Sequence, residues 1–149
     1  MDCFHYPLDT ETLLRKKRKL RRELLARNPH PLHKKIAILG GSTTNEVADQ
    51  LGLFLLQYGI EAEFYQSEYA QYWQDAMFGT PELDGFHPDV IYIHTNWRNI
   101  INFPTTATPQ AEIDAMLNAE YSRFEQMWQA LEAKLHCPVT QNNFDRPNY

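Results

Sequence analysis

The chain alternates short apolar runs with longer segments whose apolar residues recur at helical spacing. Apolar runs within residues 36–39 and 89–94 are typical of strands buried on both faces. Residues 60–65 alternate between apolar and polar side chains, and residues 137–143 form a shorter candidate strand. Helical segments separate these strands, which predicts the order βαβαβαβ and a parallel sheet with helices on both faces.

Four segments have the apolar spacing of helices. They cover residues 10–28, 44–58, 66–78 and 109–135, and loops are expected at 79–88 and 95–109. Thr43 and Glu46 have the spacing of a capping box, and Gly59 stands where a C-terminal glycine cap belongs. The predicted fold class is α/β: a three-layer, doubly wound sheet of about four parallel strands, preceded by a basic N-terminal helix.

Two parts of the chain are expected. Residues 1–33 hold an irregular start and the basic helix, which packs on the domain, and residues 34–149 form the α/β domain. Four strands are few for this architecture, and the last lies at the very end of the chain. We therefore expect the domain to be incomplete at its C-terminus.

Positive charge is concentrated in one segment of an otherwise acidic chain. Residues 1–35 contain ten Lys or Arg against four Asp or Glu, whereas residues 36–149 contain four against fifteen. Seven of the eight residues from Arg15 to Arg22 are basic, and no aromatic residue lies among them. This helix could bind nucleic acid, an anionic membrane surface or an acidic partner, or it could dock its leucines on the domain. We favour docking, and no nucleic-acid partner is favoured.

The composition indicates a cytoplasmic globular protein. No run of about 18 apolar residues predicts a membrane span. No apolar segment of a signal peptide precedes Lys16. Cys3 and Cys137 lie far apart and outside any metal-ligand spacing, so free thiols in a reducing compartment are expected. No metal site and no cofactor are expected in this chain.

The segment from Lys35 to Glu46 carries the strongest local signal. A buried strand leads into Gly40 and Gly41, which permit a sharp turn and the close approach of another group. Three hydroxyl side chains, Ser42 to Thr44, follow at the start of a helix. Free N–H groups, a helix dipole and these hydroxyls would lie at the carboxyl end of a strand, where open α/β sheets hold their sites.

Polar side chains follow all four strands, and the carboxyl ends of parallel strands meet at one edge of a sheet. We call this edge the polar rim and predict that it binds a substrate or a partner. Its predicted members are Gly40, Gly41, Ser42, Thr43, Glu68, His94, Thr95, Asn96, Arg98, Asn99, Gln141, Asn142 and Asn143. Structural alternatives exist: Thr43 as a helix cap, Ser42 as a turn bond, His94 as a satisfied core residue and the asparagines as loop closures.

The rim also suggests an ester hydrolase. Gly40-Gly41-Ser42 is similar to the first block of SGNH esterases, with Ser42 as the catalytic nucleophile. The N–H of Gly41 and the side chain of Asn96 or Asn99 would form the oxyanion hole. Glycine replaces the aspartate of that block, and Asp145-Arg146-Pro147-Asn148 has asparagine where a basic histidine is required. Because a serine without a base is a poor nucleophile, hydrolysis is the alternative hypothesis.

Several blocks, together with the Leu- and Arg-rich helix before them, resemble the N-terminal domain of FkbH-like proteins of the haloacid dehalogenase (HAD) superfamily. The blocks are KKIAILGGSTTN (34–45), EFYQSEY (63–69), PDVIYIHT (88–95) with RNI (98–100) and FP (103–104), and CPVTQNNF (137–144). Their order and spacing agree over nearly the whole chain.

The resemblance implies an SGNH-like or flavodoxin-like domain that precedes a HAD-type domain. The family is associated with loading a glyceryl unit from a phosphorylated three-carbon acid onto an acyl carrier protein, or with polyketide and surface-polysaccharide biosynthesis. Its chemistry is attributed to an Asp-x-Asp-x-Thr motif with Mg²⁺. Asp-x-Asp occurs nowhere in this chain, so Mg²⁺ is expected only in a downstream domain and Tyr149 looks like a truncation.

Three hypotheses follow. The chain is a non-catalytic accessory domain whose partner is an acyl carrier protein or a C-terminal HAD domain. Alternatively, it is an SGNH-type ester hydrolase that uses Ser42, or a binding module that acts through the helix Arg15–Arg22. A pocket at the rim requires Ser42, His94 and Asn143 to converge.

Overall fold

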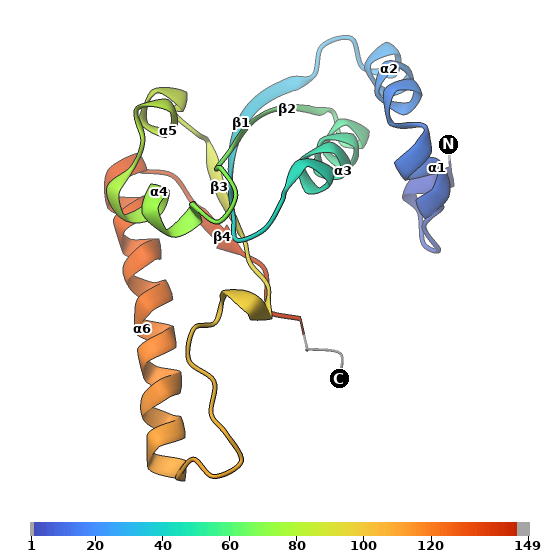
Figure 1. Ribbon diagram of the computed structural model, residues 1–149. Coiled ribbons are helices and arrows are strands. Elements are labelled where there is room, and N and C mark those ends of the chain that lie inside the picture. Colours follow the sequence, from blue (N-terminus) through green and yellow to red (C-terminus); the bar gives the residue numbers. More distant parts are fainter. Residues whose placement is uncertain (1, 146–149) are drawn as a thin grey trace.

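The computed structural model describes residues 2–145 (Figure 1). A 3-10 turn at Asp2–Phe4 precedes the first helix. The elements are α1 (Thr10–Arg15), α2 (Lys17–Arg27), β1 (Leu32–Gly40), α3 (Asn45–Gln57), β2 (Ile60–Gln66), α4 (Tyr72–Phe78), α5 (Pro81–Phe86), β3 (Val90–His94), α6 (Gln110–Leu135) and β4 (Val139–Gln141). The predicted alternation of four strands with helices is confirmed.

The four strands form one parallel sheet in the order β2-β1-β3-β4. The central strand β1 pairs with β2 over residues 32–38 and with β3 over residues 36–40. β4 pairs over three residues only and is shorter than the predicted strand at 137–143. Pro138, just before it, has no N–H to donate to a ladder.

Helices cover the two faces of the sheet unequally (Figure 1). On one face, α4 and α6 enclose a core that includes Leu39, Ile91 and Met127. On the other face, α3 packs over Ile36 and Ile38. The apolar run of β1 is buried because both of its faces are covered, as the sequence predicts.

The N-terminal helices lie outside α3. Leu20 and Leu24 of α2 are buried with Leu53 and Leu56 of α3 in a third core. The predicted single helix at 10–28 is interrupted at Lys16, which ends α1 and begins α2.

Ion pairs join the basic helix to the acidic body. The ammonium of Lys17 lies 2.8 Å from the Glu46 carboxylate and 2.6 Å from that of Asp49, and Arg21 pairs with Glu61. Exposed pairs of this kind each contribute little to stability, so the buried leucines provide most of the docking free energy.

The connection between β2 and β3 differs from the prediction. The helix expected from residue 66 begins only at Tyr72, because the backbone N–H of Ser67 still donates to Ile38 O as an extension of β2. The expected loop at 79–88 contains α5. Thr80 caps this helix by accepting a hydrogen bond from Leu83 N at 3.0 Å, and Pro81 occupies its first turn.

The predicted capping box at the start of α3 is wrong. The helix begins at Asn45 with Thr44 as the N-cap residue, and no side chain caps it. The Thr44 hydroxyl, which is buried, instead donates to Gln66 Oε1 at 2.8 Å. Gly59 does end this region with a positive φ of 77°, as a glycine cap requires.

Within residues 2–145, no helix combines the length and the apolar content needed to cross a membrane. Cys3 is buried and Cys137 half-buried, and both are free thiols.

Shortening a side chain on the buried face of α6 should destabilise the domain strongly. Leu131 is fully buried, so Leu131→Ala should lower the free energy of unfolding by about 2–5 kcal/mol through lost burial and the cavity left behind. Leu117→Ala on the same helix should change it by roughly 0.5 kcal/mol or less, because Leu117 is 68% exposed. Urea denaturation measures both, and equal losses would contradict this assignment of the core.

Candidate functional site

Two backbone donors of the turn after β1, the N–H groups of Gly40 and Gly41, make hydrogen bonds within the protein. The N–H of Gly40 donates to Ser67 Oγ at 2.8 Å, and the N–H of Gly41 donates to His94 O at 2.9 Å. A substrate oxyanion bound at Gly41 would have to replace the bond to His94. The turn therefore ties β1 to β2 and β3 at the carboxyl ends of the strands.

Asn99 braces the same turn from the loop after β3. Its Nδ2 donates to Gly41 O at 3.2 Å, and its Oδ1 accepts from Asn96 N at 2.9 Å. A Cβ at Gly41 would overlap the Asn99 carboxamide, so glycine is required there by close approach. Asn96 in turn caps the 3-10 helix Trp97–Asn99 by accepting from Arg98 N at 2.9 Å. The carboxamides proposed as oxyanion donors thus hold the loop.

Within the described part of the chain, no hydrogen bond joins the candidate nucleophile to a base. Ser42 is half-buried and Thr43 exposed, and neither side chain makes a hydrogen bond within residues 2–145. His94 Nδ1 instead lies 3.1 Å from the hydroxyl of Tyr92, two residues earlier on β3. Burial lowers the pKa of His94 and raises that of Tyr92, so both groups are neutral near pH 7.

Polar side chains at the end of β4 form a second hydrogen-bonded cluster with Thr95. Thr95 is buried, and its backbone N–H donates to Asn142 Oδ1 at 3.0 Å while its O accepts from Asn142 Nδ2 at 2.7 Å. Gln141 Nε2 donates to Thr95 Oγ1 at 2.8 Å, and Gln141 Oε1 accepts from Trp128 Nε1 at 2.7 Å. Every one of these polar groups has a partner, which stabilises the join between β3, β4 and α6.

The structure assembles the predicted rim only in part. Gly41, His94, Asn96 and Asn99 form one connected group, and Thr95, Gln141 and Asn142 form another. Glu68 and Asn143 are exposed, and the Arg98 guanidinium stacks on Trp97 at 4.9 Å. No hydrogen bond joins Ser42, His94 and Asn143 within the described part of the chain. The assignment of Ser42 as catalytic stays a prediction.

An ion pair on α6, which sequence reasoning missed, anchors the long loop after β3. Glu120 is buried, and its Oε1 accepts from the backbone N–H groups of Ile101 and Asn102, each at 3.1 Å. Arg123 pairs with Glu120 at 2.9 Å and donates to Asn99 O at 2.7 Å. A Glu-x-x-Arg pair is a common surface feature of helices, so only tertiary burial distinguishes this one.

An apolar cleft opens beside the rim. It has a volume of about 440 Å³, within the range of small-molecule sites. The loop at 100–104, the N-terminal half of α6 and Phe144 enclose it. Glu120 lies in its lining but is already neutralised by Arg123. The cleft therefore favours an uncharged, apolar occupant.

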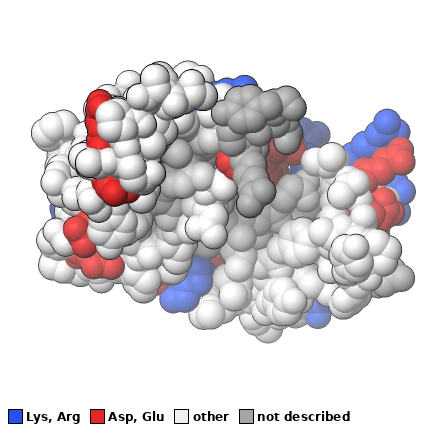
Figure 2. Space-filling model, turned by 90° about the horizontal axis from the view of Figure 1, so that it is seen from below, with Lys and Arg blue, Asp and Glu red and all other residues white. Residues whose placement is uncertain are grey.

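Figure 2 shows the molecule from the side toward which the strands run. Uncharged side chains dominate this view, and Lys and Arg lie mainly at its margins. Among residues 2–145, no group of three or more His, Cys, Asp or Glu side chains is placed to hold a metal ion. Of the predicted rim residues, only Glu68 and Arg98 are of a charged type, so the rim offers hydrogen-bonding groups more than concentrated charge.

The fold and the rim define a parallel α/β domain of the class that holds sites at its carboxyl edge. No family model matches the sequence, and no curated protein does. A solved structure, the N-terminal part of the Bacteroides fragilis protein BF1531 containing a phosphatase domain complexed with Mg, is similar with a TM-score of 0.66 and 16% identity. The match covers 89% of this chain and 34% of that one. It shows the fold, and this chain spans about a third of that structure.

The imidazole of His94 should titrate below its ordinary pKa of 6.5, because burial disfavours its charged form. Since the folded-state pKa lies below the unfolded one, the stability contributed by the neutral ring is present above pH 6.5 and is lost as the pH falls. NMR titration measures this pKa, and urea denaturation at neutral and mildly acidic pH should show a smaller pH dependence in His94→Gln than in wild type. His5→Gln controls for the loss of an imidazole. A folded-state pKa at or above the ordinary value would refute the assignment.

Glu120→Gln should loosen the loop without unfolding the domain. The variant keeps the shape of the side chain but loses charge-assisted bonds, each worth about 1.5–3 kcal/mol. Hydrogen exchange at Ile101 and Asn102 should therefore accelerate by tenfold or more on that scale. Glu132→Gln, on an exposed position of α6, is the matched control. Unchanged protection of both amides in Glu120→Gln would show that the ion pair does not hold the loop.

Proposed function

We propose that this chain is a non-catalytic accessory domain of an FkbH-like protein of the HAD superfamily. It acts by binding, and the chemistry belongs to a HAD-type domain that uses Mg²⁺. The reaction is the loading of a glyceryl unit, from a phosphorylated three-carbon acid, onto an acyl carrier protein, or a related step of polyketide or surface-polysaccharide biosynthesis.

One observation carries this proposal: Gly41, Asn96 and Asn99, the groups that an oxyanion hole would need, hydrogen-bond within the protein, while the cleft next to them is open. Gly41 and Asn99 make internal hydrogen bonds, and among residues 2–145 no base is hydrogen-bonded to Ser42. Such a rim provides a rigid surface and not a set of reactive groups. The similarity to the N-terminal part of a phosphatase-domain protein is consistent with an accessory position.

The apolar cleft is the surface that we expect to contact the partner. Its wall includes Leu117, which is 68% exposed, and Tyr121, which is 56% exposed. Exposed apolar side chains grouped around a concave surface mark sites of association. Phe103, half-exposed on the anchored loop, completes the opposite wall.

A binding titration tests the accessory role. The ¹⁵N-labelled chain would be titrated with a HAD-type protein and, separately, with a holo-acyl carrier protein from the same genome. We expect amide shifts around the cleft for at least one of them, and we expect Leu117→Glu to weaken binding by tenfold or more because it places a charge in an apolar contact. Ala115→Glu, on the opposite side of α6, is the matched control. Absence of shifts with both proteins would overturn the proposal.

Ester hydrolysis by Ser42 is tested in the same preparation. The wild-type chain, Ser42→Ala and Ser122→Ala would be assayed with p-nitrophenyl acetate. Because no base within residues 2–145 is hydrogen-bonded to Ser42, we expect all three rates to be equal within error. A rate that falls only in Ser42→Ala would establish the hydrolase and contradict the non-catalytic role.

A further inference from the structure

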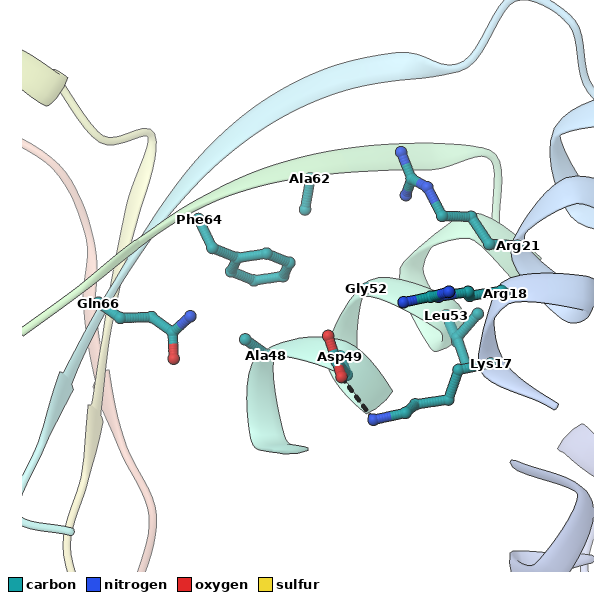
Figure 3. A pocket seen from close by; sticks show the side chains of 10 residues that line it. All are labelled: Lys17, Arg18, Arg21, Ala48, Asp49, Gly52, Leu53, Ala62, Phe64 and Gln66. Carbon is teal, nitrogen blue, oxygen red and sulfur yellow. Dashed lines mark hydrogen bonds and ion pairs between the residues drawn. The ribbon is translucent and has the colours of Figure 1, made fainter. Parts of the chain in front are cut away.

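A crevice on the far side of the molecule from the apolar cleft brings the basic helix and an aromatic ring together. We call it the α2–α3 crevice; its volume is about 590 Å³, within the range of small-molecule sites. It lies between α2, α3 and the outer strand β2 (Figure 3). Its lining residues are Lys17, Arg18, Arg21, Ala48, Asp49, Gly52, Leu53, Ala62, Phe64 and Gln66.

The crevice exists because small residues face each other across it. Ala48 and Gly52 lie one turn apart on α3, and Ala62 stands opposite on β2. The ring of Phe64 lies against Gly52, where an added Cβ would come within 3.3 Å of its Cε2. Figure 3 shows this ring pointing into the crevice. A flat ligand ring could therefore pack on Phe64, beside the small residues Ala48, Gly52 and Ala62.

Among residues 2–145, one cation at the mouth of the crevice is not engaged in an ion pair. Lys17 pairs with both Asp49 and Glu46, whose two negative charges exceed its own, and Arg21 pairs with Glu61. Arg18 is exposed and has no ion-pair or hydrogen-bond partner among residues 2–145. Figure 3 shows the side chains of Arg18 and Arg21 extending from α2 toward the crevice. An anionic group at the mouth would pair with Arg18 and lie close to Arg21.

A free amide donor lies at the opposite end. Gln66 Oε1 accepts from the Thr44 hydroxyl, which orients the carboxamide. The Nε2 of Gln66 makes no hydrogen bond within the described residues, and Figure 3 shows the group directed into the crevice. It could donate to an acceptor on the edge of a ring that packs on Phe64.

We propose that the α2–α3 crevice binds a nucleoside monophosphate. A planar ring with acceptors on its edge packs against Phe64 and meets Gln66, and one phosphate pairs with Arg18. This combination of an aromatic platform with guanidinium groups is a common way to hold a nucleotide. The site is independent of the proposed accessory role, because it shares no residue with the apolar cleft.

Titration of the ¹⁵N-labelled full chain with AMP, GMP, CMP and UMP tests the site. At least one of them should shift the amides of Gly52, Phe64 and Gln66. Adenosine and ribose 5-phosphate should each bind at least tenfold more weakly than the matching monophosphate, because each lacks one of the two contacts. Affinity should fall as salt is raised, since one ion pair contributes to binding.

Two arginine variants of α2 make the test specific. Arg18→Gln should weaken binding about tenfold and reduce its salt dependence. Arg22→Gln removes an exposed cation that lies outside the crevice, and it should bind like wild type. Thermal unfolding should show both variants folded, since neither position is buried.

Three results would overturn the proposal. They are the absence of shifts at millimolar concentration of all four monophosphates, equal weakening by the two arginine variants, and shifts confined to the outer face of α2. The last two would indicate charge attraction without a site. Phe64→Leu gives a further check, because it keeps an apolar side chain but should lose the preference for ligands that carry a ring.

Discussion

The burial of β1 on both faces is the constraint on which the rest of the structure depends. Residues 36–39 contact one core through α4 and α6 and another through α3, while the strand pairs on both edges. The strand can neither shift nor rotate without exposing apolar surface on one side. Its end at Gly40 therefore fixes where the turn lies, and Gly41 lets the loop after β3 approach that turn closely. The rim takes its geometry from this strand.

The sequence predicted the parts of the fold that rest on strong periodicity. The apolar run of β1 and the long helical pattern of α6 stand out because burial demands them over many residues. The break at Lys16 and the late start of α4 at Tyr72 were not predicted, since tertiary contacts decide them. The short helix α5 was assigned to a loop, although Thr80-Pro81 carries a recognisable start signal.

The sequence predicts the candidate site as a set of residue types at one edge of the sheet. In the structure, hydrogen bonds divide part of that set into two separate groups. Chain order shows that Gly41, Asn99 and Asn142 lie near strand ends. It does not show that their polar groups bond each other, because partners 47 or 58 positions apart leave no local pattern. The α2–α3 crevice was not predicted from the sequence, for a related reason. A basic stretch and a phenylalanine 46 positions beyond Arg18 become neighbours only when α2 docks.

The length of α6 has a consequence for how the domain moves. With 26 residues it spans about 39 Å, but only its C-terminal half lies in the core with Met127 and Leu131. Its N-terminal half lines the apolar cleft and holds the loop after β3 through Glu120, and Figure 1 shows this half extending past the sheet. Such a helix unfolds in stages, because opening the projecting turns costs less free energy than opening the turns packed in the core. A partner in the cleft must therefore offset the entropy of ordering those turns, which favours fast, reversible association over a permanent complex.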